Sequence, residues 1–350
     1  MANQIDTMFP SQNIDKLKQD LIEDKSIALF LGSGTDLTKK YPPEACYARL
    51  RDLEKYGISW NNLVETLIDA AELSKEEKEA IKRISNNPLK VAILKNRMGD
   101  SYIPIIQGWL YERCNQDVLW DSYRFFREYK EQPSVEKLRD VPFGTLFFIA
   151  DLILRQTTIK AVFTQNYNNF LSETIRILLK EACETYPEER RSLNPIDAYA
   201  GWKDGPNDKN SFFIYHVHGY IPPTSEIAPK KENNDIVLSD EEFYRLSKDV
   251  FSWQNASQIH FLTHHTCILI GLSLDDLTIL RLLRHANIEN NSETVYWIRG
   301  GGLDGNEVES RLKAEYFESQ MLCVVNDENG YTDLYHQLLE VLHNKESQTL

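Results

Sequence analysis

A glycine-rich turn is the first segment of the chain whose residue types suit chemistry on a nucleotide. The turn, Gly32-Ser33-Gly34-Thr35, follows a short apolar run at residues 27–31. Glycines let a backbone turn sharply and approach a pyrophosphate, whose charge then faces the N–H groups of a helix start. The third glycine of the full dinucleotide fingerprint is absent from the matching position. A tight turn after a core strand therefore explains this segment equally well.

Two histidines form a second group of chemically capable residues. His216 and His218 lie near the end of an apolar run at residues 212–217, directly before Gly219. Residues two positions apart share one face of a strand. The pair is compatible with two metal ligands, with one catalytic base at a strand end, or with two side chains satisfied by local hydrogen bonds.

Two further segments carry side chains that bind sugars and phosphates well. Gln165 and Asn166 follow the run at residues 160–164, and Gly271 and Ser273 follow the run that begins at residue 267. Carboxamides offer both donors and an acceptor, so they can hold ribose hydroxyls or position a water. A small residue and a hydroxyl at a turn suit a ribose or a phosphate. Plain helix N-capping by nearby Asn or Asp is the alternative for both segments.

The elements that must position these residues alternate along the chain. Apolar runs predict strands, and 3.6-residue periods predict helices. The predicted strands are residues 27–31, 160–164, 212–217, 267–271 and 294–298; the predicted helices are 12–24, 169–184, 240–262, 275–288 and 331–343; residues 186–211 and 221–235 have loop composition. This alternation predicts a doubly wound, mostly parallel Rossmann-like α/β sheet, which gathers the residues that follow its strands around one crevice.

The stretch from residue 60 to residue 145 has a different character. It keeps helical periodicity, contains few β-branched runs, and includes a capping-box pattern that begins at Ser74. We therefore predict a helical subdomain at residues 61–145, inserted after the first βα unit. The Rossmann-like domain would then comprise residues 12–60 and 146–345.

Composition narrows the possible functions. The chain has 350 residues with 39 Lys+Arg against 53 Asp+Glu, a net charge of −14. Such a charge disfavours direct nucleic-acid binding. No apolar stretch approaches about 18 residues, which disfavours a membrane span. The N-terminus lacks the pattern of a secretory signal, and the five cysteines are scattered without a CxxC pair. We expect free thiols, no structural zinc module and a cytoplasmic location.

Taken in order, these motifs resemble those of the sirtuin-like domain, especially its branch in bacterial anti-phage defence. The matching segments are GSGT, TQNYNN, HVHG, IVLSDEEFYRL and LIGLSLDD, and ISWNNLVETL resembles a segment that the defence members carry after the first loop. The resemblance extends over roughly residues 15–343 and is dense only in the motifs.

The resemblance implies a role for each matching residue. Gly32, Ser33, Gly34 and Thr35 would hold the pyrophosphate of NAD⁺. Gln165 and Asn166 would hold the nicotinamide-side ribose and the attacking water. His218, which directly precedes the glycine, would be the general base, and Gly271 and Ser273 would hold the adenosine-side ribose.

Two departures from the family pattern affect what the chain is expected to do. Deacetylating sirtuins hold a zinc module on two CxxC pairs, which this chain lacks. The family also has Asp where this chain has Asn168. The first departure counts against protein deacylation, and the second removes a negative charge near the site, which would weaken activity or make it wait on a partner.

The resemblance thus implies an NAD⁺ glycohydrolase that forms nicotinamide and ADP-ribose without a metal. The open alternatives are a catalytically weak sensor that binds NAD or ADP-ribose, a deacylase and a dehydrogenase. By resemblance we expect an effector that depletes NAD⁺ in abortive infection. We also expect self-association and a separate partner, either a HerA-type ring ATPase or a nucleotide-sensing subunit.

Overall fold

The computed structural model describes most of the chain. The described residues are 10–23, 25–36, 59–113, 116–199, 209–223, 236–273, 277–286, 294–300, 312, 315–317, 322–327 and 332–349. Within these ranges, none of the helices is both long and apolar enough to span a membrane.

A seven-stranded sheet forms the centre of the molecule. In chain order its strands are β1 (Ile27–Leu31), β2 (Ile159–Thr164), β3 (Asn194–Ala198), β4 (Ser211–His216), β5 (Thr266–Ile270), β6 (Val295–Gly300) and β7 (Leu322–Asp327). Their spatial order is β3-β4-β2-β1-β5-β6-β7, and every described pair is parallel. The protein therefore has the predicted α/β architecture.

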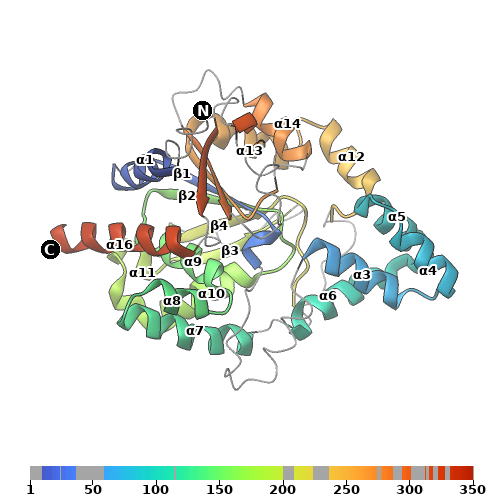
Figure 1. The fold of residues 1–350 in the computed structure, drawn as a ribbon, viewed down its shortest axis with the longest axis horizontal. Coiled ribbons are helices and arrows are strands. Elements are labelled where there is room, and N and C mark those ends of the chain that lie inside the picture. Colours follow the sequence, from blue (N-terminus) through green and yellow to red (C-terminus); the bar gives the residue numbers. More distant parts are fainter. Residues whose placement is uncertain are drawn as a thin grey trace, which may run out of the picture.

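Helices account for most of the remaining described residues (Figure 1). The α-helices are α1 (Pro10–Ile22), α3 (Trp60–Ala70), α4 (Lys75–Lys82), α5 (Asn87–Met98), α6 (Tyr102–Arg113), α7 (Gln116–Glu131), α8 (Val135–Asp140), α9 (Gly144–Arg155), α10 (Phe170–Ala182), α11 (Glu188–Arg191), α12 (Asp240–Lys248), α13 (Trp253–His264), α14 (Leu277–His285) and α16 (Thr332–Thr349). Three short 3-10 helices are η1 (Ser33–Asp36), η2 (Gly99–Ser101) and η3 (Cys183–Thr185).

The central strand β1 separates two hydrophobic cores. Side chains alternate across a strand, so Leu29 packs into the core shared with α1, α9, α10 and α16, and Phe30 packs into the core shared with α13 and α14. All five residues of β1 are buried. Burial on both faces explains why this strand is a continuous apolar run and not an alternating pattern.

The segment predicted as a helical insert contains α3 to α8 and the first residues of α9. In Figure 1, α3 to α6 lie together beside the sheet, next to α12, whereas α7 and α8 lie beneath α9 and α10. Ser74 and Glu77 form the predicted capping box at the start of α4. The domain boundary itself stays a prediction.

Three parts of the chain differ from the predicted elements. The predicted loop at residues 186–211 contains α11 and β3, an edge strand paired only with β4, where a proline is tolerated. Strand β7 was not predicted, and it is the opposite edge. The predicted helix at residues 240–262 is two helices, because Ser252 caps a new start and Asn255 donates to the carbonyls of Leu246 and Asp249.

The chain order places four strand ends side by side. Strands β4, β2, β1 and β5 are neighbours, and they are the strands that precede the four predicted motifs. The chain leaves β1 for β2 on one side and later returns to β5 on the other side. The carboxyl ends of β1 and β5 therefore flank the switch point where such sheets bind ligands.

A buried carboxylate inside α9 fixes this helix to its neighbours. Asp151 is 1% exposed and accepts hydrogen bonds from Lys130 at 2.9 Å, Arg155 at 2.9 Å and Tyr186 at 2.8 Å. Burial alone would raise the pKa of Asp151, but the two cations overcome this effect and lower it.

We predict that Asp151→Ala lowers the free energy of unfolding by about 3–5 kcal/mol, because it leaves the buried guanidinium of Arg155 and the partly buried Lys130 without their partner. Asp121→Ala, which removes a half-exposed ion pair with Arg124, should cost less than about 1 kcal/mol. Urea denaturation of both variants checks this prediction, and equal losses would contradict it.

Candidate functional site

The loops that follow β1 and β5 touch through their backbones. The N–H of Gly32 donates to the carbonyl of Ile270, and the N–H of Gly34 donates to the carbonyl of Gly271, both at 3.0 Å. A Cβ at Gly32 would lie 2.4 Å from the Gly271 carbonyl oxygen, and a Cβ at Gly34 would lie 2.8 Å from the Gly271 Cα. Glycine is required here because the two main chains leave no room for a side chain.

Gly271 is constrained in two ways. Its φ is +66°, which lies in the left-handed region, and a Cβ on it would lie 2.6 Å from the nitrogen of Thr35. Gly32 and Gly34 from the loop after β1 and Gly271 from the loop after β5 are therefore in direct backbone contact at the switch point. The tight-turn explanation of the sequence therefore fits the glycines, and the turn lies at the switch point, where such sheets bind ligands.

Most N–H groups of the glycine-rich turn are already used within the protein. Besides Gly32 and Gly34, the N–H of Thr35 donates to the carbonyl of Gly32 at 3.0 Å. Residues 33–36 form only the short η1, and the segment after residue 36 lies outside the described residues. Three of the four N–H groups of residues 32–35 are thus engaged within the protein, and the role of these residues toward a pyrophosphate stays a prediction.

Asn166 links the loop after β2 to the glycine-rich turn. Its side-chain Nδ2 donates to Thr35 Oγ1 at 3.0 Å and to the Gly32 carbonyl at 3.3 Å, and its main-chain N–H donates to Thr164 Oγ1 at 3.1 Å. The neighbouring Gln165 N–H donates to the carbonyl of Leu31 at 2.9 Å. The structure thus brings Asn166 against the predicted nucleotide loop and places Gln165 beside the end of β1.

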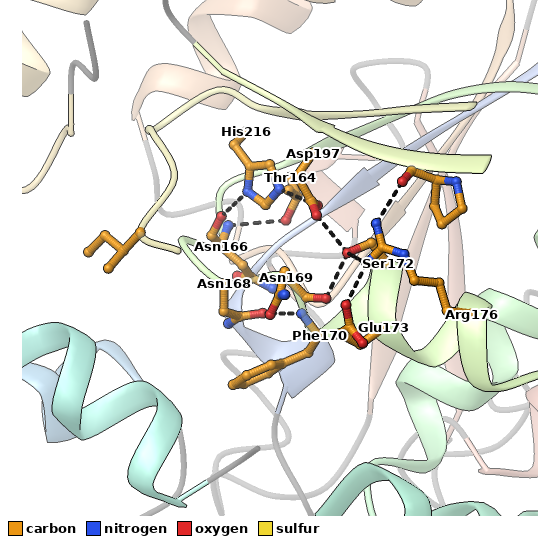
Figure 2. Close-up of polar contacts among 12 residues, drawn as sticks. Thr164, Asn166, Asn168, Asn169, Phe170, Ser172, Glu173, Arg176, Asp197 and His216 are labelled. Carbon is orange, nitrogen blue, oxygen red and sulfur yellow. Dashed lines mark hydrogen bonds and ion pairs between the residues drawn. The ribbon is translucent and has the colours of Figure 1, made fainter. Parts of the chain in front are cut away.

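The two histidines have different surroundings. His218 is 4% exposed, its ring lies edge-on to Phe243 with the centroids 5.3 Å apart, and Gly219 after it has a φ of 93°. His216 is 1% exposed, and its two ring nitrogens contact the carbonyl of Asn166 and the carboxylate of Asp197 (Figure 2). Both nitrogens of His216 are occupied, so the structure does not support this residue as a metal ligand.

The structure describes only some of the residues predicted after β5. Ser273 is exposed just after the Gly271 turn, and Asp275 and Asp276 lie outside the described residues. Among the residues that the structure describes, no group of three or more His, Cys, Asp or Glu side chains could hold a metal ion. The roles of Gly271, Ser273 and His218 stay predictions.

Asp36 is a site residue that the sequence analysis missed. It is 2% exposed, its Oδ2 accepts from Asn168 Nδ2 at 2.6 Å, and its Oδ1 accepts from Thr35 Oγ1 at 3.3 Å. Burial raises the pKa of Asp36 to about 6, against the opposing effects of Asn168, Thr35, His216 and Asn166. Its signal in the sequence was an acid directly after the glycine-rich turn.

Asn168 serves both Asp36 and the following helix. Its Oδ1 accepts from the N–H of Phe170 at 3.1 Å at the start of α10, as expected for one asparagine of this segment. Its Nδ2 contacts Asp36. The position of Asn168 therefore has a carboxylate beside it, that of Asp36, and the effect of Asn168 on activity stays a prediction.

Comparison with known proteins gives two similarities. Residues 160–320 match the model of the SIR2-like domain. The chain also resembles a solved structure described as "Structural Basis for the Mechanism and Regulation of Sir2 Enzymes", with 9% sequence identity and a TM-score of 0.39, over 96% of this chain and 99% of that one. No curated protein matches the chain significantly.

We predict that Gly271→Ala destabilises the fold more than Gly99→Ala. Both glycines have positive φ, +66° and +58°, but a Cβ at Gly99 meets nothing within 4 Å. Both substitutions place a side chain on a residue with positive φ, and only Gly271→Ala adds the close contact with Thr35. Gly271→Ala should cost about 1–3 kcal/mol more in urea denaturation, and equal costs would show that the two loops are not in close contact.

We also predict a pH-dependent stability difference between Asp36→Asn and the parent chain. Between pH 4 and 6 the folded parent still holds the Asp36 proton, whereas the unfolded chain, with the ordinary pKa of 3.8, has lost it. The parent therefore loses stability through Asp36 as the pH rises through this window, and the variant does not. The unfolding free energy of the variant minus that of the parent should rise by about 2 kcal/mol from pH 4 to pH 7. A difference that stays constant over this range would contradict a buried Asp36.

Proposed function

Because this chain contains a sirtuin-like domain, whose family indicates NAD-related activity, we propose that it is an NAD⁺ glycohydrolase. It would cleave NAD⁺ to nicotinamide and ADP-ribose. The observation that carries this proposal is the contact of the Asn166 side chain with the glycine-rich turn, at the switch point of the sheet. One amide is thereby fixed at the place where the ribose of a nucleotide on this loop would lie.

The reaction exchanges one bond at the anomeric carbon of the ribose. The bond to nicotinamide breaks with its electron pair going to the positively charged ring, so the leaving group becomes neutral without an acid. A water oxygen forms the new bond and gives up one proton. The protein must hold the ribose, orient the water and accept that proton.

Asn166 and His218 are the residues proposed for these tasks. The Nδ2 of Asn166 is directed at Gly32 and Thr35, so its Oδ1 is the atom that would accept a hydrogen bond from the water or a ribose hydroxyl. His218 would accept the proton, since histidine is the side chain that most often serves as a base at neutral pH. Gln165 would hold the same ribose, and Gly271 and Ser273 would contact the adenosine side.

Asp36 supports hydrolysis over the sensor alternative. The sensor alternative depended on the missing charge at Asn168, and Asp36 supplies a buried carboxylate 2.6 Å from the Asn168 amide. A carboxylate among amides holds their orientation because it accepts from their N–H groups. The polar groups needed to fix the site are therefore present in this chain.

The biological setting is proposed from the sequence motifs alone. We propose an effector of bacterial anti-phage defence that depletes NAD⁺ when triggered, with self-association and a separate HerA-type ATPase or nucleotide-sensing partner. Comparing NAD⁺ consumption by the chain alone and with each partner class tests this setting. Equal consumption in every case would overturn the need for a trigger.

We predict that Asn166→Ala and His218→Ala each reduce nicotinamide release at least 100-fold, because each removes a group that acts on the water. The matched controls Asn61→Ala and His260→Ala change exposed side chains on α3 and α13 and should keep the parent rate. Release is measured by chromatography, and circular dichroism checks the fold. Parent-like rates for both site variants would overturn the assignment.

A further inference from the structure

The segment that leads into α12 begins the motif IVLSDEEFYRL, to which the proposed hydrolysis assigns no role. Its first residues, Ile236, Val237 and Leu238, lie outside the helices and strands, and Val237 is 2% exposed. Buried main-chain groups outside regular structure need hydrogen-bond partners from elsewhere in the chain. The partners of Val237 therefore decide where this segment lies.

Both main-chain groups of Val237 bond to residues of the candidate site. Its N–H donates to the carbonyl of His218 at 2.9 Å, and its carbonyl accepts from the Oη of Tyr167 at 2.7 Å. The direction of each bond is unambiguous, because a carbonyl only accepts and an N–H only donates. Val237 thus connects the proposed base to the residue that directly follows Asn166.

Tyr167 also holds the chain that follows His218. Its main-chain carbonyl accepts from the N–H of Ile221 at 2.7 Å. On the other side of His218, Val217 donates its N–H to the carbonyl of Thr164, at the end of β2, at 3.0 Å. The main chain is therefore anchored before, at and after His218, and two of these three anchors pass through Tyr167.

An ion pair holds the other end of the segment. The Glu242 carboxylate accepts from the N–H groups of Leu238 and Ser239 at 2.9 and 2.8 Å, and it pairs with Lys95 of α5. Helices α5 and α12 lie side by side (Figure 1). The ion pair fixes the segment on the α12 side, and Tyr167 fixes it on the β2 side.

The Tyr167 hydroxyl does more than satisfy a buried carbonyl. The carbonyl that it satisfies belongs to Val237, whose N–H bonds to His218. The same motif supplies Phe243, whose ring packs edge-on against the His218 imidazole. Proton transfer needs the base within hydrogen-bond reach of the water, so a small displacement of this histidine lowers the rate.

We propose that Tyr167 is a positioning residue: its hydroxyl fixes Val237, and Val237 in turn fixes the main chain of His218 relative to Asn166. The segment at residues 236–238 then serves as the support of the proposed base. The anchor is a property of the fold, whereas its consequence for catalysis rests on the proposed hydrolysis.

The first test needs no substrate. Tyr167→Phe removes only the hydroxyl, so the amide hydrogen of Val237 in the full chain should exchange about 5-fold faster or more, as measured by NMR. Tyr296→Phe is the matched control, because it also removes a hydroxyl bond of 2.7 Å, to Asp20, and it should change the Val237 rate less than about 2-fold. Equal Val237 rates in the parent and in a folded Tyr167→Phe would overturn the proposal.

Kinetics separate positioning from a general loss of structure. In Tyr167→Phe, kcat for nicotinamide release should fall about 10-fold while the KM for NAD⁺ stays within about 2-fold, since the hydroxyl bonds to the protein and not to the substrate. Tyr296→Phe should keep the parent kcat. An unchanged kcat in Tyr167→Phe, with or without a rise in KM, would overturn the positioning role.

The double variant Tyr167→Phe/His218→Ala tests whether the effect passes through the histidine. Without the imidazole no base is left to position, so adding Tyr167→Phe should lower kcat less than about 2-fold. The same loss of about 10-fold in both backgrounds would show that the hydroxyl acts elsewhere. A parent chain that releases no nicotinamide under any condition would refute the proposed hydrolysis, and the exchange rate of Val237 would still decide the anchor.

Discussion

The close backbone contact between the loops after β1 and β5 is the constraint on which the site depends. Gly34 and Gly271 meet without room for a side chain, and this contact fixes where the first loop lies at the switch point. The Asn166 amide then bonds to that loop, and Asp36 bonds to Asn168 behind it. Side chains held in this way need little reorganisation when a ligand arrives, which is the property that catalytic geometry requires.

The electrostatic environment of this site depends on nearby groups and not on the net charge of the chain. The chain carries a net charge of −14, and the proposed substrate is itself anionic, so the overall field does not attract it. The N–H groups of Gly32, Gly34 and Thr35 serve the protein's own carbonyls. The polar groups around the loop therefore include buried side chains: Asp36 contacts Asn168 and Thr35, and His216 contacts Asp197.

The sequence predicted the parts of this structure that depend on local pattern. Buried parallel strands such as β1 are continuous apolar runs, and each of the four predicted motifs follows one of four adjacent strands. The edge strand β3 was missed because it includes a proline and has an exposed end. Asp36 was missed because its importance comes from burial between loops that are far apart in sequence, and only the fold creates that environment. The same holds for His216, whose partner Asp197 lies in the segment predicted to be a loop.

The most direct test of the central claim is product analysis of the purified chain incubated with NAD⁺. The account predicts nicotinamide and ADP-ribose in equal amounts, formed by the chain alone or once its trigger is supplied. Recovery of intact NAD⁺ under every condition would contradict the account. Conversion to the reduced cofactor, or acyl transfer to ADP-ribose without hydrolysis, would contradict it equally and would place the chemistry of this site in another class.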